Sequence, residues 1–156
     1  MNGIHGSFVF TDFDAEGMLV EGFEELSTLP DIYNFTYYPK HVESYGYVKD
    51  VDWLEYQVKV PTEIPEKALR IAEIVLKKNK LSIVQAKKSK DLLKYAYDIF
   101  DVIAKTYREL YSFVPLTKMQ VDFYIKQYFP HIVPDYVTMV VDNNNEIAGF
   151  VIGCRH

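Results

Sequence analysis

The run of acidic residues nearest the amino terminus has the spacing of a cation-binding loop. Asp12, Asp14 and Glu16 alternate with other residues and precede Gly17, as in the opening of a calcium loop, where carboxylates wrap a hard cation and glycine permits the turn. The twelfth position of such a loop requires a bidentate glutamate, but here it is Phe23. The run therefore indicates a polar turn between two strands, and no metal site is predicted there.

Histidine and cysteine give no stronger signal. The sequence contains His5, His41, His131 and His156, none of them at the His-x-x-x-His or paired-cysteine spacing that surrounds zinc. The single cysteine, Cys154, stands two residues before His156, yet a nucleophile and base also need a third group that orients them. We interpret Cys154 as a buried structural thiol.

Two pairs of acids could be proposed for acid–base chemistry. They are Glu43 with Glu55, and Asp50 with Asp52. General acid–base catalysis needs two groups at defined distances from a substrate, and sequence spacing fixes no such distance for these pairs. Because acids of this kind are mostly surface residues, we assign them no catalytic role.

The best binding candidate is a cluster of aromatic residues, Tyr33, Phe35, Tyr37 and Tyr38. Aromatic residues make up 15% of the chain, with thirteen Tyr and ten Phe. Rings with polar tips can stack on a ligand and also hydrogen-bond to it. The alternative interpretation is that these rings pin their own loop onto the core.

The secondary structure predicted to position these residues changes after residue 60. Before that point, the patterns over 7–11, 17–23 and 51–60 predict strands. Between them, Pro39 and Gly46 suit the first turn and the carboxyl cap of a short helix over 38–46.

Helices dominate the region after residue 60. Pro65 opens a helix over 65–78 that bridges the two halves, with lysines near its carboxyl end. A strand follows over 81–85, and then a long amphipathic helix that Ser89 caps and Pro115 breaks. Thr117 and Gln120 form the capping box of another helix, which Pro130 ends. Residues 136–141 and 146–154 are predicted strands of a hairpin, joined by a turn of Asp and three Asn.

Composition excludes several classes of protein. The chain has 156 residues, of which 49% are apolar and 25% charged, which is typical of a globular protein. Its net charge is −5 and its 17 Lys and Arg are interspersed with acids, so we expect no nucleic-acid partner. No apolar run approaches the roughly 20 residues that span a bilayer, and the amino terminus lacks the order of a signal peptide. We therefore expect a cytoplasmic protein without a membrane partner.

Several stretches of the sequence together form a recognisable pattern. Residues 8–23 read Phe8-Val-Phe-Thr-Asp-Phe-Asp-Ala-Glu-Gly-Met-Leu-Val-Glu-Gly-Phe23, and later stretches are Ile32-Tyr-Asn34, Tyr37-Tyr-Pro39, 45–53, 112–117, 137–142 and 147–153. This sequence resembles a family of bacterial proteins with tandem units related to the GNAT N-acetyltransferases. The resemblance covers nearly the whole chain.

The resemblance implies a division of the chain. Residues 1–60 resemble the carboxyl half of one GNAT-like unit, 61–80 a bridging helix, and 81–156 the amino half of a second unit, up to its third strand. A GNAT enzyme holds the pyrophosphate of acetyl-CoA on a Gln/Arg-x-x-Gly-x-Gly/Ala loop at a helix amino terminus. No such run occurs in these 156 residues. The resemblance thus implies acetyl-CoA as cofactor and an amine as substrate, but neither a strong CoA site nor a catalytic residue in this chain.

We therefore expect an α/β fold of the α+β type, with a mostly antiparallel GNAT-like sheet flanked by helices. The two halves either pack into one nearly complete sheet or leave it incomplete, and open strand edges would favour a homodimer. The leading functional interpretation is an acyltransferase-like protein that is an inactive fragment. The alternative is a non-enzymatic module that binds a ligand or a protein through Tyr33, Phe35, Tyr37 and Tyr38.

Overall fold

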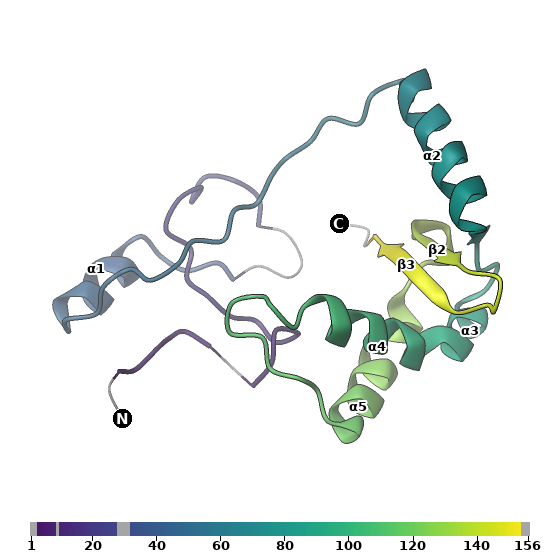
Figure 1. Cartoon of the computed structure of the whole chain (residues 1–156). Helices are drawn as coiled ribbons and strands as arrows, with labels where there is room; N and C mark the ends of the chain where they lie inside the picture. Colours follow the sequence, from purple (N-terminus) through teal and green to yellow (C-terminus); the bar gives the residue numbers. More distant parts are fainter. Residues whose placement is uncertain (1–2, 9, 28–31, 154–156) are drawn as a thin grey trace. The chain divides into compact units, whose positions relative to one another are not determined.

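The computed structural model describes residues 3–8, 10–27 and 32–153 (Figure 1). Met1–Val60 and Pro61–Arg155 form two compact units, called the N-terminal and C-terminal units below. Each unit is described by itself.

The only regular element in the described part of the N-terminal unit is the helix α1, Tyr37–Ser44. The predicted helix over 38–46 is therefore confirmed. Pro39 lies in the first turn, where a missing N–H costs nothing. Gly46 follows the last turn with φ +89°, and its N–H donates to the carbonyl of Glu43 at 2.9 Å, as expected of a left-handed glycine at a helix end.

The strands predicted over 7–11, 17–23 and 51–60 are wrong for the residues that the structure describes, since these form turns and irregular segments. A strand needs a neighbouring strand to satisfy its backbone groups, and the backbone bonds here are mostly local. Among the described residues, the N–H of Asp14 donates to the carbonyl of Thr11 at 2.9 Å, and the N–H of Gly17 donates to the more distant carbonyl of Ser7 at 2.8 Å. The polar turn predicted around Asp12 is present, but it joins no strands.

The C-terminal unit begins with the helix α2, Glu66–Asn79, as the pattern from Pro65 predicts. Lys77 and Lys78 lie in its last turn, and Lys80 closes it in the left-handed conformation with φ 53°. The predicted strand over 81–85 appears as β1, Ser82–Val84. The apolar side chains of α2 stay exposed: Ile71 is 50% and Val75 44% accessible.

The long helix predicted from Ser89 is shorter and is interrupted. It consists of α3 (Ser89–Leu92), a 3-10 turn (Leu93–Tyr95) and α4 (Ala96–Thr106). Lys88 rather than Ser89 holds the cap position, and the Ser89 hydroxyl instead donates to the carbonyl of Ile132 at 3.2 Å. The helix stops at Thr106, whose hydroxyl donates to the carbonyl of Val102 at 2.9 Å, a contact that weakens the helical ladder.

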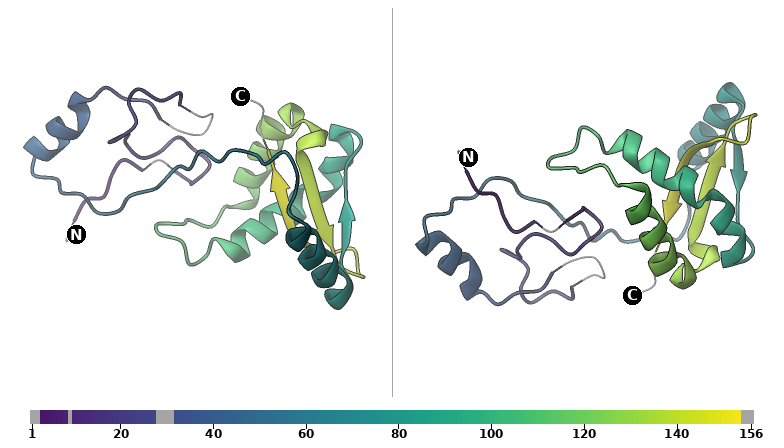
Figure 2. Two further views of the ribbon diagram at one scale, coloured as in Figure 1. Left: turned by 90° about the horizontal axis from the view of Figure 1, so that it is seen from above. Right: turned by 90° about the horizontal axis from the view of Figure 1, so that it is seen from below.

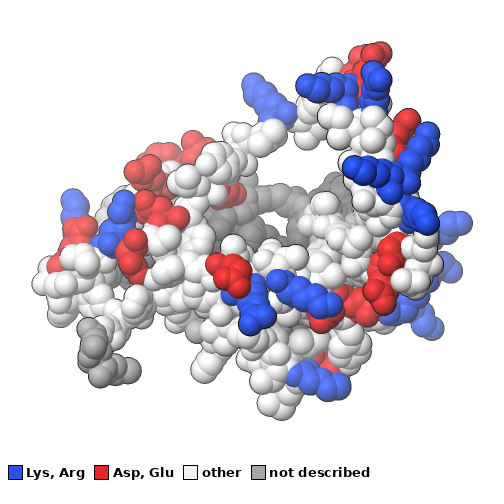
Figure 3. Space-filling model, in the orientation of Figure 1, with Lys and Arg blue, Asp and Glu red and all other residues white. Residues whose placement is uncertain are grey.

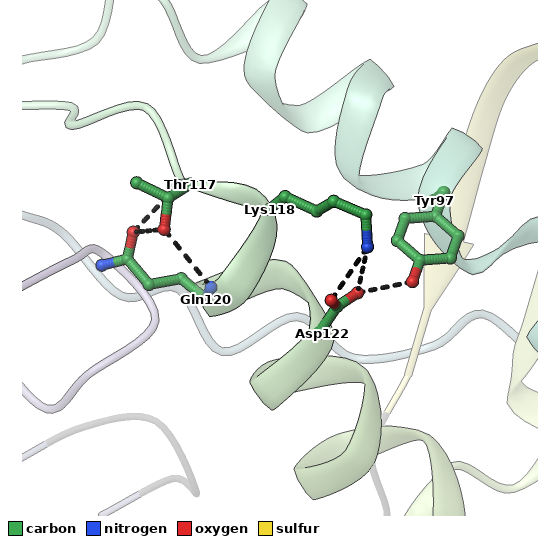
Figure 4. A network of polar contacts seen from close by, with 5 residues as sticks. All are labelled: Tyr97, Thr117, Lys118, Gln120 and Asp122. Carbon is green, nitrogen blue, oxygen red and sulfur yellow. Dashed lines mark hydrogen bonds and ion pairs between the residues drawn. The ribbon is translucent and has the colours of Figure 1, made fainter.

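The helix α5, Lys118–Tyr128, starts where the capping box predicts (Figure 4). The N–H of Thr117 donates to the side-chain oxygen of Gln120 at 2.9 Å, and the N–H of Gln120 donates to the Thr117 hydroxyl at 3.4 Å. The helix ends in the 3-10 turn Phe129–His131, which contains Pro130, and a second 3-10 turn, Pro134–Tyr136, leads into the hairpin.

The hairpin forms as predicted, from β2 (Val137–Val141) and β3 (Ile147–Ile152). Its turn is held by Asp142, whose carboxylate accepts the N–H groups of Asn144 and Glu146 at 2.8 and 2.9 Å. The strand order is β1-β2-β3 and both pairings are antiparallel, with Ser82 opposite Val141 and Val137 opposite Ile152. The predicted α+β class with an antiparallel sheet is therefore confirmed.

The core of the C-terminal unit lies between one face of this sheet and the helices (Figure 2). Alternate residues of β2, namely Val137, Met139 and Val141, are at most 4% exposed, and Leu92 and Ile99 of the helices are at most 2% exposed. The other sheet face stays open, since Val151 is 68% exposed. In the described part of the chain no strand lies beyond β1 or β3, so both edges are unpaired there.

Candidate ligand-binding site

The aromatic platform, defined as Tyr33, Phe35, Tyr37 and Tyr38, is a continuous set of ring contacts. Phe35 and Tyr37 are stacked, with centroids 5.7 Å apart and planes within 9°. Tyr37 also stacks on Tyr38 at 4.9 Å, and Tyr33 meets Phe35 edge to face at 6.4 Å. The structure therefore brings together all four residues that the sequence singled out.

These rings are surface residues rather than core residues. Tyr33 is 52% exposed, Phe35 61%, Tyr37 49% and Tyr38 46%. The alternative, that these rings pin their own loop onto the core, stays a prediction; the Tyr33 hydroxyl donates to the carbonyl of Phe23 at 3.4 Å. Half-exposed stacked rings can accept a planar group or a cation on their faces, and such contacts contribute about 0.5 to 2 kcal/mol each.

The loop that carries Tyr33 and Phe35 is also held by Asn34. Its side-chain oxygen accepts the N–H of Leu19 at 2.6 Å, and its NH₂ group donates to the carbonyl of Leu19 at 3.1 Å. A primary amide has the donor and acceptor needed to pair with both backbone groups of one residue. Sequence reasoning did not select Asn34, because its partner lies 15 residues away and no short-range pattern relates the two.

His41 was also missed as part of this site. Its imidazole meets Tyr37 edge to face at 5.4 Å. The two residues are four positions apart on α1, a spacing that places side chains on one helical face, so this signal was present in the sequence. His41 adds a polar group beside the stacked rings.

The phenol of Tyr37 is held in its protonated form. Partial desolvation, the hydrogen bond with Tyr38 and the charge of Tyr38 raise the pKa of Tyr37 above 10.0. A phenol is neutral at physiological pH with or without this shift, so its O–H remains a hydrogen-bond donor.

The acidic turn that contains Asp12 and Glu16 differs from the aromatic platform in carrying several negative charges. Burial raises the pKa of Asp12, and burial together with the charges of Asp12 and Asp14 raises the pKa of Glu16. The described residues contain no group of three His, Cys, Asp or Glu side chains that could hold a metal ion. The turn therefore presents closely spaced acidic side chains, and hydrogen bonds within the turn fix its backbone conformation.

The acids considered for acid–base chemistry have separate partners. Asp50 lies 3.1 Å from Nδ1 of His5, and Asp52 lies 2.9 Å from Nζ of Lys49. Glu43 and Glu55 are exposed. The ion pairs of the described residues join neither pair. Cys154 and His156, the other candidates, lie outside the described residues.

The C-terminal unit contains one polar network that joins two helices (Figure 4). The hydroxyl of Tyr97 on α4 donates to Asp122 on α5, and Lys118 donates to the same carboxylate at 2.9 and 3.2 Å. The Lys118 ammonium also lies 5.2 Å from the centre of the Tyr97 ring. The hydrogen bonds from Tyr97 and Lys118 lower the pKa of Asp122 below 3.8. The network is structural, since all its members are engaged with one another.

This network predicts an acid-sensitive contribution to stability. Because the pKa of Asp122 is lower in the folded than in the unfolded chain, its contribution is complete above pH 3.8 and is lost as the pH falls through the folded value. Urea unfolding of the wild type and Asp122→Asn should therefore differ most above pH 3.8 and converge as the pH falls through the folded pKa of Asp122, which lies below 3.8. A difference that persists at the lowest pH would contradict this role.

None of the helices in the described ranges is long and apolar enough to cross a membrane.

Comparison with known proteins adds no relative. No protein-family model, no curated protein and no solved structure matches this chain. The functional argument therefore rests on the residues and geometry described above.

Proposed function

We propose that this chain is a relative of the GNAT acyltransferases and that these 156 residues carry part of that fold without its CoA pyrophosphate loop. The supporting observation is the order of elements from β1 to β3. A strand is followed by two helical segments and then an antiparallel hairpin, with β1 beside β2. This is the order that the resemblance implies for the opening of a GNAT unit.

The proposal predicts no transfer of an acetyl group by this chain alone. The transfer needs an anion site for the pyrophosphate, a group that removes the amine proton and a donor to the thioester oxyanion. The sequence has no Gln/Arg-x-x-Gly-x-Gly/Ala run. Thioester release from acetyl-CoA with a panel of amines should remain at the uncatalysed rate, and turnover would overturn this part of the proposal.

A second candidate function is a binding module that uses the aromatic platform. The observation that favours it is the exposure of four rings in successive contact, at 46 to 61% each, on the loop that Asn34 fixes and the first turn of α1. A preformed site binds without the entropic cost of ordering the loop. The module would take a planar aromatic or cationic group.

Calorimetry with two probes separates the two functions. Binding of acetyl-CoA supports the acyltransferase relationship, whereas binding of an aryl-ammonium probe such as phenyltrimethylammonium supports the module. Tyr37→Leu should weaken the second probe about three- to tenfold, because one stacking or cation–π contact is lost. The matched control is Tyr45→Leu, which changes an 83% exposed tyrosine outside the platform. Equal effects of both substitutions would contradict a site on the platform.

A further inference from the structure

The charges of this chain are segregated along its sequence. Residues 77–90 contain six lysines and no acid, whereas residues 12–25 contain six acids and no Lys or Arg. The net charge of −5 conceals this segregation. A surface of one sign without counter-ions attracts a surface of the other sign over about 10 Å at physiological salt.

The six lysines form what we call the lysine surface, on both sides of the edge strand β1. Lys77, Lys78 and Lys80 precede the strand, and Lys87, Lys88 and Lys90 follow it. All six are exposed. The strand β1 has only three residues and spans roughly 10 Å, and six residues separate Lys80 from Lys87. Figure 3 shows Lys and Arg side chains gathered on the right, over the region of α2 and the elements that follow it, with Asp and Glu side chains between some of them.

The lysines of this surface have no acidic partner among the ion pairs of the described residues, which use Lys49, Lys105, Lys118 and His5 instead. The register places Val141 opposite Ser82, so Asp142 follows beside the Lys80 end of β1. Its Oδ1 atom accepts two backbone N–H groups of the hairpin turn. At the other end, the Oδ2 atom of the exposed Asp91 accepts the N–H of Lys88 at 3.1 Å. The lysine surface is therefore bounded by one acid at each end.

Lysines beside an edge strand discourage pairing with an identical edge, because like charges would meet. The same charges favour an acidic partner. The acidic stretch 12–25 of another copy of this chain is such a partner: Glu24 and Glu25 are exposed, and burial together with the charges of Asp12 and Asp14 raises the pKa of Glu16. An opposing cation would relieve that repulsion.

We propose that the lysine surface beside β1 binds the acidic stretch 12–25 of a second copy of this chain, so that the protein self-associates through unlike charges. Two copies can make this contact reciprocally, which closes the assembly as a symmetric dimer. The contact is electrostatic and on the surface, so its affinity falls as the salt concentration rises.

Sedimentation velocity of the full chain over a range of concentrations tests the proposal. At low salt we expect a concentration-dependent dimer that dissociates at about 1 M NaCl, where the Debye length falls to about 3 Å. Lys78→Glu/Lys87→Glu should weaken the dimer at least tenfold, as should Glu24→Lys/Glu25→Lys. The control Arg108→Glu/Lys126→Glu makes the same change of net charge elsewhere in the C-terminal unit and should have a smaller effect.

Mixing the two weakened variants identifies the occupant. Each variant keeps the surface that the other has lost, so an equimolar mixture should associate more tightly than either variant alone. A wild type that stays monomeric at low salt would overturn the proposal, as would a dimer that resists salt or a mixture that behaves like its components. Circular dichroism of each variant establishes that it is folded.

Discussion

Replacement of Met139 by alanine is expected to lower the free energy of unfolding of the C-terminal unit by about 2 to 5 kcal/mol. Met139 lies at the centre of β2 and is 0% exposed. It stands opposite Val84 on one side and Phe150 on the other. Truncation removes buried methylene and sulfur contacts and leaves a cavity that the neighbouring strands can only partly fill.

The matched control for this prediction is Met119→Ala, the same chemical change at a residue of α5 that is 79% exposed. It should change stability by less than about 0.5 kcal/mol. Urea unfolding followed by far-ultraviolet circular dichroism measures both variants. Similar losses in the two variants would contradict the position of β2 in the core.

Replacement of Asn34 by alanine is expected to release the loop that carries the aromatic platform. The variant loses the bonds to the N–H and carbonyl of Leu19, at 2.6 and 3.1 Å. Removing one partner of a partly buried backbone group costs about 1 to 3 kcal/mol. Amide hydrogen exchange at Leu19 should therefore accelerate roughly tenfold or more.

Two further variants give this prediction its controls. Asn34→Asp keeps the acceptor for the Leu19 N–H but loses the donor to its carbonyl, so it should fall between the wild type and Asn34→Ala. Asn143→Ala changes an exposed asparagine of the hairpin turn and should leave Leu19 unaffected. Unchanged exchange at Leu19 in Asn34→Ala would show that other contacts hold the loop.

Local signals predicted the elements whose stabilising contacts are local. The capping box of Thr117 and Gln120 set the start of α5, and Pro39 with Gly46 set the limits of α1. The turn of Asp142 set the hairpin. In each case the hydrogen bonds join residues only a few positions apart, so the sequence contains all that is needed to infer them.

The predictions that were wrong concern residues whose secondary structure or hydrogen bonding depends on residues far away in the sequence. Apolar and polar residues alternate over 17–23 and 51–60 as they do in strands. This alternation indicates a preference for a sheet, but a strand forms only where a neighbouring strand pairs with it. The predicted cap of the helix from Ser89 was wrong for a related reason, since the Ser89 hydroxyl donates to the carbonyl of Ile132 rather than to its own helix. The periodicity of apolar residues does not show whether a side chain bonds to its own helix or to a carbonyl far away in the sequence.

The same distinction applies to the candidate site. The sequence alone determined which rings belong together, because Tyr33 to Tyr38 are neighbours in the chain. Only the tertiary structure decided that these rings are exposed and that Asn34 fixes their loop through Leu19. Exposure depends on what the rest of the chain packs against a residue, and that depends on contacts between residues far apart in the sequence.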